Sequence, residues 1–185
     1  MPLTLYAHPF ASYCWKVLIA LYENATPFTY RAVEDAAAWA ELESLWPIKK
    51  FPLLRDDDST IAESSIIVEY LMRRYPGTTQ FIPENDDASL RVRFMDRFFD
   101  NYVMTPMSTL VSNRLRLENE RDPKGDADAR KMLDVAYGWL AFIDPAHIFS
   151  QKLSLERIRS SGYITVTFSL LLCYRNGYVI LMVWI

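Results

Sequence analysis

A pair of lysines runs into an apolar segment at residues 48–54, Ile-Lys-Lys-Phe-Pro-Leu-Leu. Its proline has no N–H to give to a strand ladder. A cis Phe51–Pro52 bond would leave the backbone groups of Phe51 facing outward, where they could pair with a peptide-like ligand. A trans proline on an edge strand is the alternative, and for an isolated X-Pro bond it is the commoner form. The surrounding elements must decide between the two.

The composition of the whole chain limits the kinds of partner and metal that the protein is expected to bind. The 185 residues carry a formal net charge of -3 with a pI near 5.4, which argues against nucleic acid, because such partners need a concentrated basic face. Cys14 and Cys173 form no CxxC pair and have no histidine cluster nearby, so we expect neither a disulfide nor a zinc site. The N-terminus lacks the pattern of a secretory signal. We therefore expect a cytoplasmic, metal-free protein.

The first part of the chain alternates strands and helices. Residues 3–7 predict a short strand, residues 28–33 are rich in β-formers, and residues 35–46 predict a helix that Pro47 ends. A further helix is predicted between the strands at 3–7 and 28–33. Its apolar side chains share one face: Cys14, Val17, Leu18 and Leu21.

A hairpin and a third helix follow. Two β-rich segments flank the acidic triplet at 56–58, which is typical of a turn. A helix starts at Ser64, directly after Glu63, and Pro76-Gly77 ends it. The order is a parallel crossover followed by an antiparallel hairpin, which predicts a small α/β unit with a mixed sheet.

Strand signals then disappear until the end of the chain. Turn-forming residues at 76–87 predict a linker, and apolar periodicity indicates two long helices, over 88–118 and 126–143, with a break at 122–125. The last part, 163–185, is apolar with a single charge.

This apolar tail has three explanations. Asn176-Gly177 between two β-rich runs favours a hairpin. A non-native or disordered segment and a membrane contact are the alternatives. Arg175-Asn176-Gly177 cuts the run into pieces that are short of the roughly 20 residues a membrane-crossing helix needs, which argues against a membrane span.

Two stretches now bear on the proline at 52. The order of elements is that of the thioredoxin fold, and Lys-Lys-Phe-Pro followed by Ala-Glu-Ser-Ser-Ile-Ile-Val-Glu-Tyr-Leu (62–71) resembles the glutathione-binding half of the glutathione S-transferases. Residues 98–107 resemble the first helix of that family's helical domain. The resemblance covers residues 1 to about 140.

The resemblance implies three regions. These are an α/β thioredoxin-like N-terminal domain (βαβαββα, with a cis proline) at 1–78, an all-α domain at 79–145 that is truncated or altered, and an atypical apolar tail at 146–185.

The resemblance also implies a partner for each group of glutathione. The γ-glutamyl carboxylate would lie at Ser64 and the start of its helix, and Glu63 or a neighbouring acid would pair with the ammonium. The backbone of Phe51 would pair with the cysteinyl group like an added strand, which requires Pro52 to be cis. Lys50, with Lys49 as a second candidate, would pair with the glycyl carboxylate. A capping serine and solvated lysines explain these residues singly, but their order and spacing together favour the binding function.

The group that activates the glutathione thiol lies, in this superfamily, near the end of the first strand or the start of the first helix. Ser12 is our candidate, although the theta- and zeta-like serine aligns nearest Ala11. His8 stands where omega-like enzymes have cysteine, and Tyr6, Tyr13 and Cys14 are weaker alternatives. Cys14 has the pattern of a buried core thiol.

The resemblance also assigns Phe10 and Tyr102 to the pocket for a second, electrophilic substrate. It implies a detoxifying transferase, with peroxidase activity as a possible side reaction. The family normally continues with further helices that complete this pocket, and residues 149–168 contain no convincing equivalent of their capping box. An altered reading frame near residue 141 would explain the departure. A glutathione-binding or interaction protein without transferase activity is therefore the alternative function.

Association follows from the same resemblance. Family members pair through the first domain of one subunit and the helical domain of the other. Phe94, Phe98 and Phe99 span more than one face of their predicted helix, so that helix must bury more than one side. We expect a homodimer.

Overall fold

The computed structural model describes residues 3–143, 171–175 and 178–182. It forms two compact units: the first holds the described residues up to Val92 and the two C-terminal strands, and the second begins at Arg93. The predicted domain bounds differ, since they place a boundary after residue 78. They stay a proposal, and most of the predicted tail at 146–185 lies outside the described residues.

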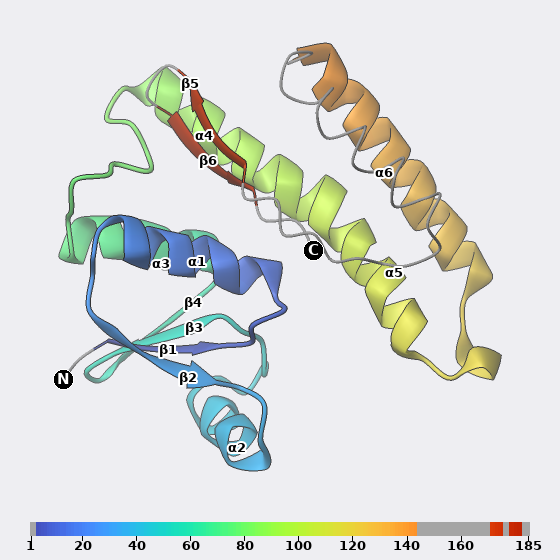
Figure 1. The fold of residues 1–185 in the computed structure, drawn as a ribbon, viewed down its shortest axis with the longest axis horizontal. Coiled ribbons are helices and arrows are strands. Elements are labelled where there is room, and N and C mark those ends of the chain that lie inside the picture. The colour runs from blue at the N-terminus through green and yellow to red at the C-terminus, as the bar shows by residue number, and fades with distance from the viewer. Residues whose placement is uncertain (1–2, 144–170, 176–177, 183–185) are drawn as a thin grey trace. The chain divides into compact units, whose positions relative to one another are not determined.

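A four-stranded mixed sheet forms the centre of the first unit (Figure 1). Its strands are β1 (Leu3–Ala7), β2 (Phe28–Ala32), β3 (Leu53–Asp56) and β4 (Ser59–Ala62), in the spatial order β2-β1-β3-β4. β1 pairs with β2 in parallel and with β3 antiparallel, and β3 and β4 form an antiparallel hairpin. This is the mixed sheet that the sequence predicts, a crossover followed by a hairpin.

Helices cover both faces of this sheet. They are α1 (Ser12–Glu23), α2 (Ala36–Leu45) and α3 (Ser64–Arg74). α1 and α3 lie together on one face and α2 lies on the other (Figure 1). The ends of α2 follow from sequence: Asp35 Oδ1 accepts the N–H of Ala38 at 2.7 Å as an N-cap, and Pro47 follows the last turn.

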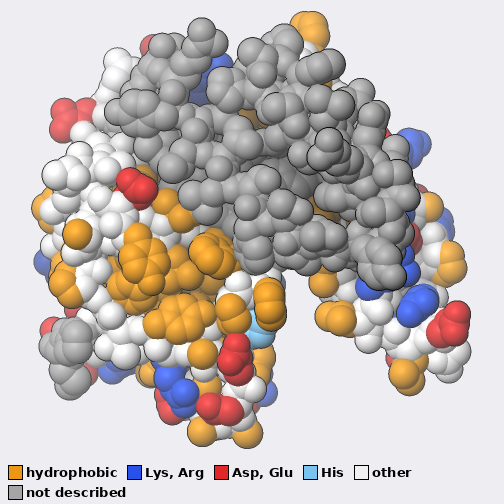
Figure 2. Space-filling model, in the orientation of Figure 1, with side chains coloured by type: hydrophobic (Ala, Val, Ile, Leu, Met, Phe, Trp, Pro, Cys, Tyr) orange, Lys and Arg blue, Asp and Glu red, His pale blue; other side chains and the backbone are white. Residues whose placement is uncertain are grey.

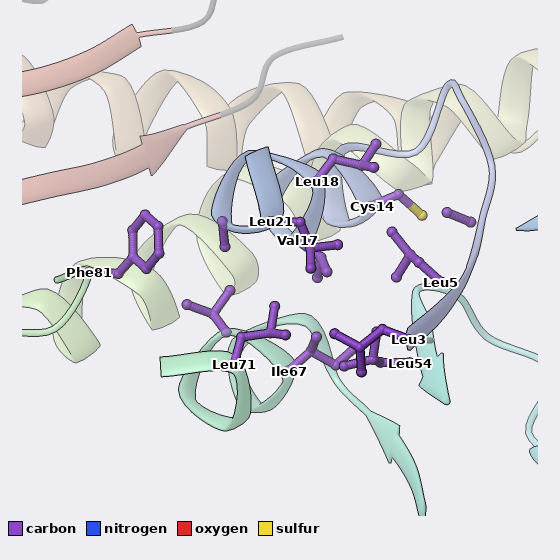
Figure 3. Packing of buried hydrophobic residues seen from close by; sticks show 13 residues of the cluster. Leu3, Leu5, Cys14, Val17, Leu18, Leu21, Leu54, Ile67, Leu71 and Phe81 are labelled. Atoms are coloured by element: carbon purple, nitrogen blue, oxygen red, sulfur yellow. The ribbon is translucent and has the colours of Figure 1, made fainter. Parts of the chain in front are cut away.

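The larger core lies between the sheet and the pair α1 and α3 (Figure 3). Alternate residues of β1 point into it, because side chains on a strand alternate between the two faces. Its fully buried members include Leu5, Cys14, Val17, Leu21, Leu54 and Ile67. A smaller cluster of Val33, Leu42 and Leu53 lies on the α2 side.

The second unit is helical. Its chain runs through α4 (Asp86–Phe98), the π-helical segment η1 (Phe99–Met104), α5 (Thr105–Leu115), the short 3-10 turn η2 (Glu118–Glu120) and α6 (Pro123–Ile143), with the division between the units inside α4. The predicted helix over 88–118 is therefore one run with a π-helical segment in its middle. Sequence periodicity does not reveal such a segment, because it changes the turn by one residue over a short stretch.

The predicted break before the last helix is a capping structure. Asp122 Oδ1 accepts the N–H of Gly125 at 2.9 Å, and Pro123 is the first residue of α6. The side-chain amide of Asn113 pairs with both backbone groups of Asp122, at 2.7 and 3.1 Å. The helix thus begins three residues earlier than the expected residue 126, because an aspartate followed by proline starts a helix well.

Two strands near the C-terminus pair antiparallel, β5 (Leu171–Arg175) and β6 (Tyr178–Met182), with Arg175 opposite Tyr178. Their pairing agrees with the hairpin prediction, although the predicted turn residues lie outside the described part. In the described residues, no helix combines the length and apolar character needed to cross a bilayer.

Candidate functional site

Three segments of the first unit come together at one end of the sheet. The loop after β1 and the segment before β3 are neighbours, because Tyr6 of β1 pairs with Leu53 of β3. The imidazole of His8 stacks on the ring of Phe51, with centroids 5.8 Å apart and an interplanar angle of 24°. The structure thus brings together the candidate loop and the proline segment.

The start of α3 is the third segment. The Nζ atom of Lys16, in the second turn of α1, donates to the Oγ atom of Ser65 at 2.8 Å. At the other end of the two helices, the Asn24 amide exchanges two hydrogen bonds with the backbone of Thr79, at 2.8 and 3.0 Å. These contacts align α1 and α3, so the amino ends of both helices lie at the same end of the unit.

The peptide bond between Phe51 and Pro52 is cis, as predicted. Pro52 is buried, and the paired residues of β3 begin only at Leu53, so Phe51 lies before the ladder. The ring of Phe51 contacts His8 and, edge-on, Trp39 of α2 at 5.8 Å. Its ring is therefore fixed from two sides at the position where the sequence predicts pairing with a peptide.

The two lysines before Phe51 differ in their surroundings. Lys49 has a φ of 58° and its Nζ atom lies 2.6 Å from the carboxylate of Glu43. Lys50 is exposed, and within the described residues it has no ion pair. The predicted carboxylate-binding residue, Lys50, is thus the lysine that is available to a ligand.

Glu63 and Ser64 occupy the junction of β4 and α3. Glu63 is the N-cap residue, with a φ of 69° that is uncommon for a residue other than glycine. Its carbonyl accepts the N–H of Ile67 at 2.9 Å, while its side chain makes no capping bond. Ser64 is therefore the first helical residue, and the explanation of Ser64 as a capping serine does not apply.

The hydroxyl of Ser64 lies at the positive end of α3. The residue is only 6% exposed, and its hydroxyl makes no hydrogen bond to any described residue. The first turn of the helix carries no acidic side chain. Free N–H groups and the helix dipole make such an end attractive to an anion.

Ser12 is the first residue of α1 and is 7% exposed. Within the described part, its hydroxyl has no hydrogen-bond partner. The alternative His8 uses its Nδ1 atom to accept the N–H of Phe10 at 3.2 Å. The alternative Tyr6 packs against the cluster on the α2 side of the sheet. These positions do not decide which residue activates a thiol, and Ser12 stays our prediction.

Cys14 is a core residue, as its pattern predicted. Its side chain is fully buried between the sheet and the helices. Burial raises the pKa of its thiol to about 12, because the thiolate would lose its hydration, and a backbone hydrogen bond from His8 offsets this only in part. Cys14 is thus unsuited to act as a nucleophile.

The two residues predicted for a second-substrate pocket lie in different units. Phe10 is 64% exposed beside His8. Tyr102 belongs to η1 and contacts Phe98 of its own unit, with ring centroids 5.4 Å apart. The pocket therefore stays a prediction.

Two neighbours of the site were not predicted, Lys16 and Trp39. Lys16 follows Ser12 by one helical turn, so its side chain is on the same side of α1, and this spacing could have revealed it. Trp39 gives no comparable signal. Among the described residues there is no group of His, Cys, Asp and Glu side chains suited to a metal ion.

Comparisons with known proteins agree on one family. The model for "Glutathione S-transferase, N-terminal domain" matches residues 5–79. Glutathione S-transferase theta-1 of Homo sapiens is 32% identical over 122 residues, which are 63% of this chain and 47% of the relative. Glutathione S-transferase U10 of Arabidopsis thaliana is 29% identical over 126 residues, which are 68% and 53%. The chain thus spans about half the length of these curated relatives.

A solved structure is similar over a longer stretch. It is a glutathione transferase family member from Pseudomonas fluorescens Pf-5 with bound glutathione. The TM-score is 0.67 at 23% identity, and the match covers 82% of this chain and 74% of that one. This likeness shows the fold, a thioredoxin-like unit followed by helices.

Proposed function

Because the chain belongs to the glutathione S-transferase superfamily, we propose that it binds glutathione in its first unit and activates the glutathione thiol for attack on small electrophiles. One observation carries most of the support. The cis Phe51–Pro52 segment, the loop after β1 and the start of α3 lie at one end of one sheet. Each segment can meet a different part of a tripeptide.

The ligand's polar groups have matching partners in this arrangement. The γ-glutamyl carboxylate suits Ser64 and the N–H groups at the start of α3, and the exposed Glu63 is available to the ammonium. The backbone of Phe51 suits the cysteinyl group, as an added strand would. Lys50 suits the glycyl carboxylate better than Lys49, because Lys49 is already paired with Glu43.

The chemistry needs a thiolate. A free thiol has a pKa of about 8.5, so a hydroxyl that donates to the sulfur favours the reactive form at neutral pH. Ser12 would supply this hydrogen bond from the start of α1, with His8 and then Tyr6 as alternatives. The thiol proton passes to solvent, the sulfur forms a bond to the electrophilic carbon, and the leaving group departs with its electron pair.

The full chain can test this function directly. We expect saturable glutathione binding by calorimetry and conjugation of glutathione to an aryl halide. Ser12→Ala should lower turnover while affinity for glutathione changes little, because the lost bond is to the thiolate. The same effect from His8→Ala would assign the activation to His8 instead. A chain that binds no glutathione would refute the proposal.

A second function is favoured by one finding: the positions of Ser12, His8 and Tyr6 do not single out a group that activates the thiol. In this case the chain binds glutathione without transferring it. Saturable binding with no turnover of an aryl halide, a peroxide or an epoxide would support this alternative.

We further propose a homodimer located in the cytoplasm. Part of the aromatic surface expected to pair is used inside the second unit, since Phe98 contacts Trp139 with ring centroids 4.5 Å apart. Phe94 is 50% exposed and remains available to a partner. Light scattering of the full chain should give twice the monomer mass, and Phe94→Ala should weaken the association. A monomeric mass at high concentration would exclude the dimer.

A further inference from the structure

The sheet of the first unit has an open edge at β2. This strand is the last in the sheet and is hydrogen-bonded to β1 alone. Directly after it, the N–H of Val33 donates to the carbonyl of Ala7 at 2.9 Å, so Val33 faces β1. Because backbone groups alternate in direction along a strand, the N–H and C=O groups of Phe28, Tyr30 and Ala32 point away from the sheet. Within the described part of the chain these groups have no hydrogen-bond partner.

The side chains beside these backbone groups are apolar or aromatic. Phe28 packs against the larger core, which places Phe28, Tyr30 and Ala32 on the α1 face of the sheet. Tyr22 of α1 contacts Phe28 edge-on, with ring centroids 5.5 Å apart, and is itself 69% exposed. Hydrophobic side chains gather between α1 and β2 on the visible face of the unit (Figure 2). The edge thus combines unpaired backbone groups with an apolar surface.

β2 has none of the features that usually keep an edge strand from pairing. These features are charged side chains that reach into solvent at the edge, prolines within the strand, and bulges. The charged residue of β2, Arg31, lies on the α2 face, where its Nη2 atom is 2.8 Å from the carboxylate of Glu41. All residues of the strand pair with β1 in one unbroken register. The edge is therefore regular and open to a further strand.

The opposite edge of the sheet, β4, is protected by charge. Asp57 and Asp58 precede this strand and Glu63 follows it, and all three residues carry carboxylates. Two antiparallel copies of β4 would bring the start of one strand beside the end of the other, so like charges would meet. The contrast indicates that β2, and not β4, is suited to pair with a second copy of the chain.

The residue order of β2 fits an antiparallel copy of itself. In a pair centred on Tyr30, this residue faces its own counterpart, and Phe28 faces Ala32 of the other copy. Thr29 then faces Arg31, so no like charges lie directly opposite each other. The outward groups match, because directly opposite residues exchange both N–H···O bonds in such a pair. On the α1 face, an aromatic pair lies in the middle, with a large residue opposite a small one on each side.

We propose that β2 is a self-association edge, along which two copies of the chain pair antiparallel about Tyr30 and join their four-stranded sheets. This two-fold contact is separate from the homodimer proposed through the second unit, and it does not depend on glutathione binding. A single pair of short strands buries little surface, so we expect the contact to form at high protein concentration and to join two dimers.

Disulfide cross-linking tests the register of the pair. In a Cys173→Ser background, Tyr30→Cys would place two thiols on Cα atoms about 5.5 Å apart, within the range that a disulfide spans. Mild oxidation should give a covalent dimer on a non-reducing gel. The yield should exceed that of Ser59→Cys, an exposed position of β4, by about tenfold or more, because only the first pair of thiols would be held opposite each other. The native Cys14 is buried and does not compete.

Light scattering over a range of concentrations tests the association without a cross-link. The mass of the wild type should rise from twice towards four times the monomer mass. Tyr30→Lys should stop this rise, because two ammonium groups would face each other across the pair. Ser59→Lys puts the same charge on the opposite edge and should behave as the wild type. Thermal unfolding shows whether Tyr30→Lys is folded, and the cross-linking result decides if it is not.

The outcomes separate the two contacts. A Tyr30→Cys yield no higher than that of Ser59→Cys, or a rise in mass that folded Tyr30→Lys does not change, overturns the pairing at β2. A wild type that is a monomer at low concentration, and in which Tyr30→Cys still cross-links, overturns the dimer of the second unit and supports the contact at β2.

Discussion

The two units bury their apolar side chains to different degrees. In the first unit, Leu5, Leu21 and Leu54 have no exposed surface. In the described part of the second unit, the most buried core residues, Val103 and Ala136, are still 3% exposed. The second unit also leaves large apolar side chains in water, among them Leu115, Leu117, Val135 and Phe142.

This difference indicates that the first unit can hold the residues of a site in place by itself. A sheet with helices on both faces closes a core within the first unit, and the family model matches this same part of the chain. Apolar side chains also gather on the visible face of the first unit, with charged groups around them (Figure 2). A rigid core under the candidate site lets backbone groups keep their positions when a ligand binds.

The largest expected effect concerns thiol reactivity. In a Cys173→Ser background, Cys14 should react with a disulfide reagent at neutral pH at least about a thousandfold more slowly than in denaturant, because burial hides it and raises its pKa to about 12. A thiol introduced by Val135→Cys, at a 63% exposed position of α6, should react fast. Rapid labelling of Cys14 in the folded chain would show that the first core opens readily.

Truncating a buried core side chain should destabilise the protein more in the first unit than in the second. Leu54→Ala should lower the free energy of unfolding by about 3–4 kcal/mol, and Leu133→Ala, at a 9% exposed position, by about 1–2 kcal/mol. Phe142→Ser is a control, expected to change it by less than about 0.5 kcal/mol because the ring is already in water. Urea unfolding of the full chain measures all three. Equal losses at Leu54 and Leu133 would contradict the comparison.

A smaller, pH-dependent effect should come from Asp56. Its carboxylate accepts hydrogen bonds from the hydroxyls of Tyr70 at 2.7 Å and Tyr75 at 2.8 Å. The bond from Tyr70 contributes most to lowering the pKa of Asp56, and the bond to Asp56 raises the pKa of Tyr75 to about 12.

The signs of these two shifts give two pH windows. A lowered carboxyl pKa stabilises the fold above about pH 4, the unfolded value, and this stability is lost as the pH falls further. A raised tyrosine pKa stabilises the fold below about pH 10, and this stability is lost between about pH 10 and 12. Asp56→Asn should remove the pH dependence of stability in both ranges. It should also lower the free energy of unfolding by about 1–2 kcal/mol at pH 7. Thermal unfolding from pH 3 to 11 measures this, and parallel curves for the variant and the wild type would refute it.

Sequence predicted the elements of the first unit well because local signals agreed there. The apolar spacing from Cys14 to Leu21 and the proline at 47 each act over a few residues. The cis state of Phe51–Pro52 followed from the family resemblance and not from the local residues, which also allow a trans bond on an edge strand.

The remaining features depend on contacts between residues that are far apart in the sequence, so local sequence patterns do not reveal them. The bond from Lys16 to Ser65 joins residues 49 positions apart, and the ring of Trp39 reaches Phe51 from another helix. The start of α6 had a local signal, Asp122 before Pro123, which is a helix start and not a break.

Ser64 provides the most direct test that the first unit holds a glutathione site. Calorimetry on the full chain should show saturable binding, and Ser64→Ala should weaken it by about 1–3 kcal/mol, because a charged carboxylate loses a hydrogen bond in a buried place. Ser108→Ala, an exposed serine of α5, is the matched control and should leave the affinity unchanged. A dissociation constant that is the same for Ser64→Ala and the wild type would contradict the site.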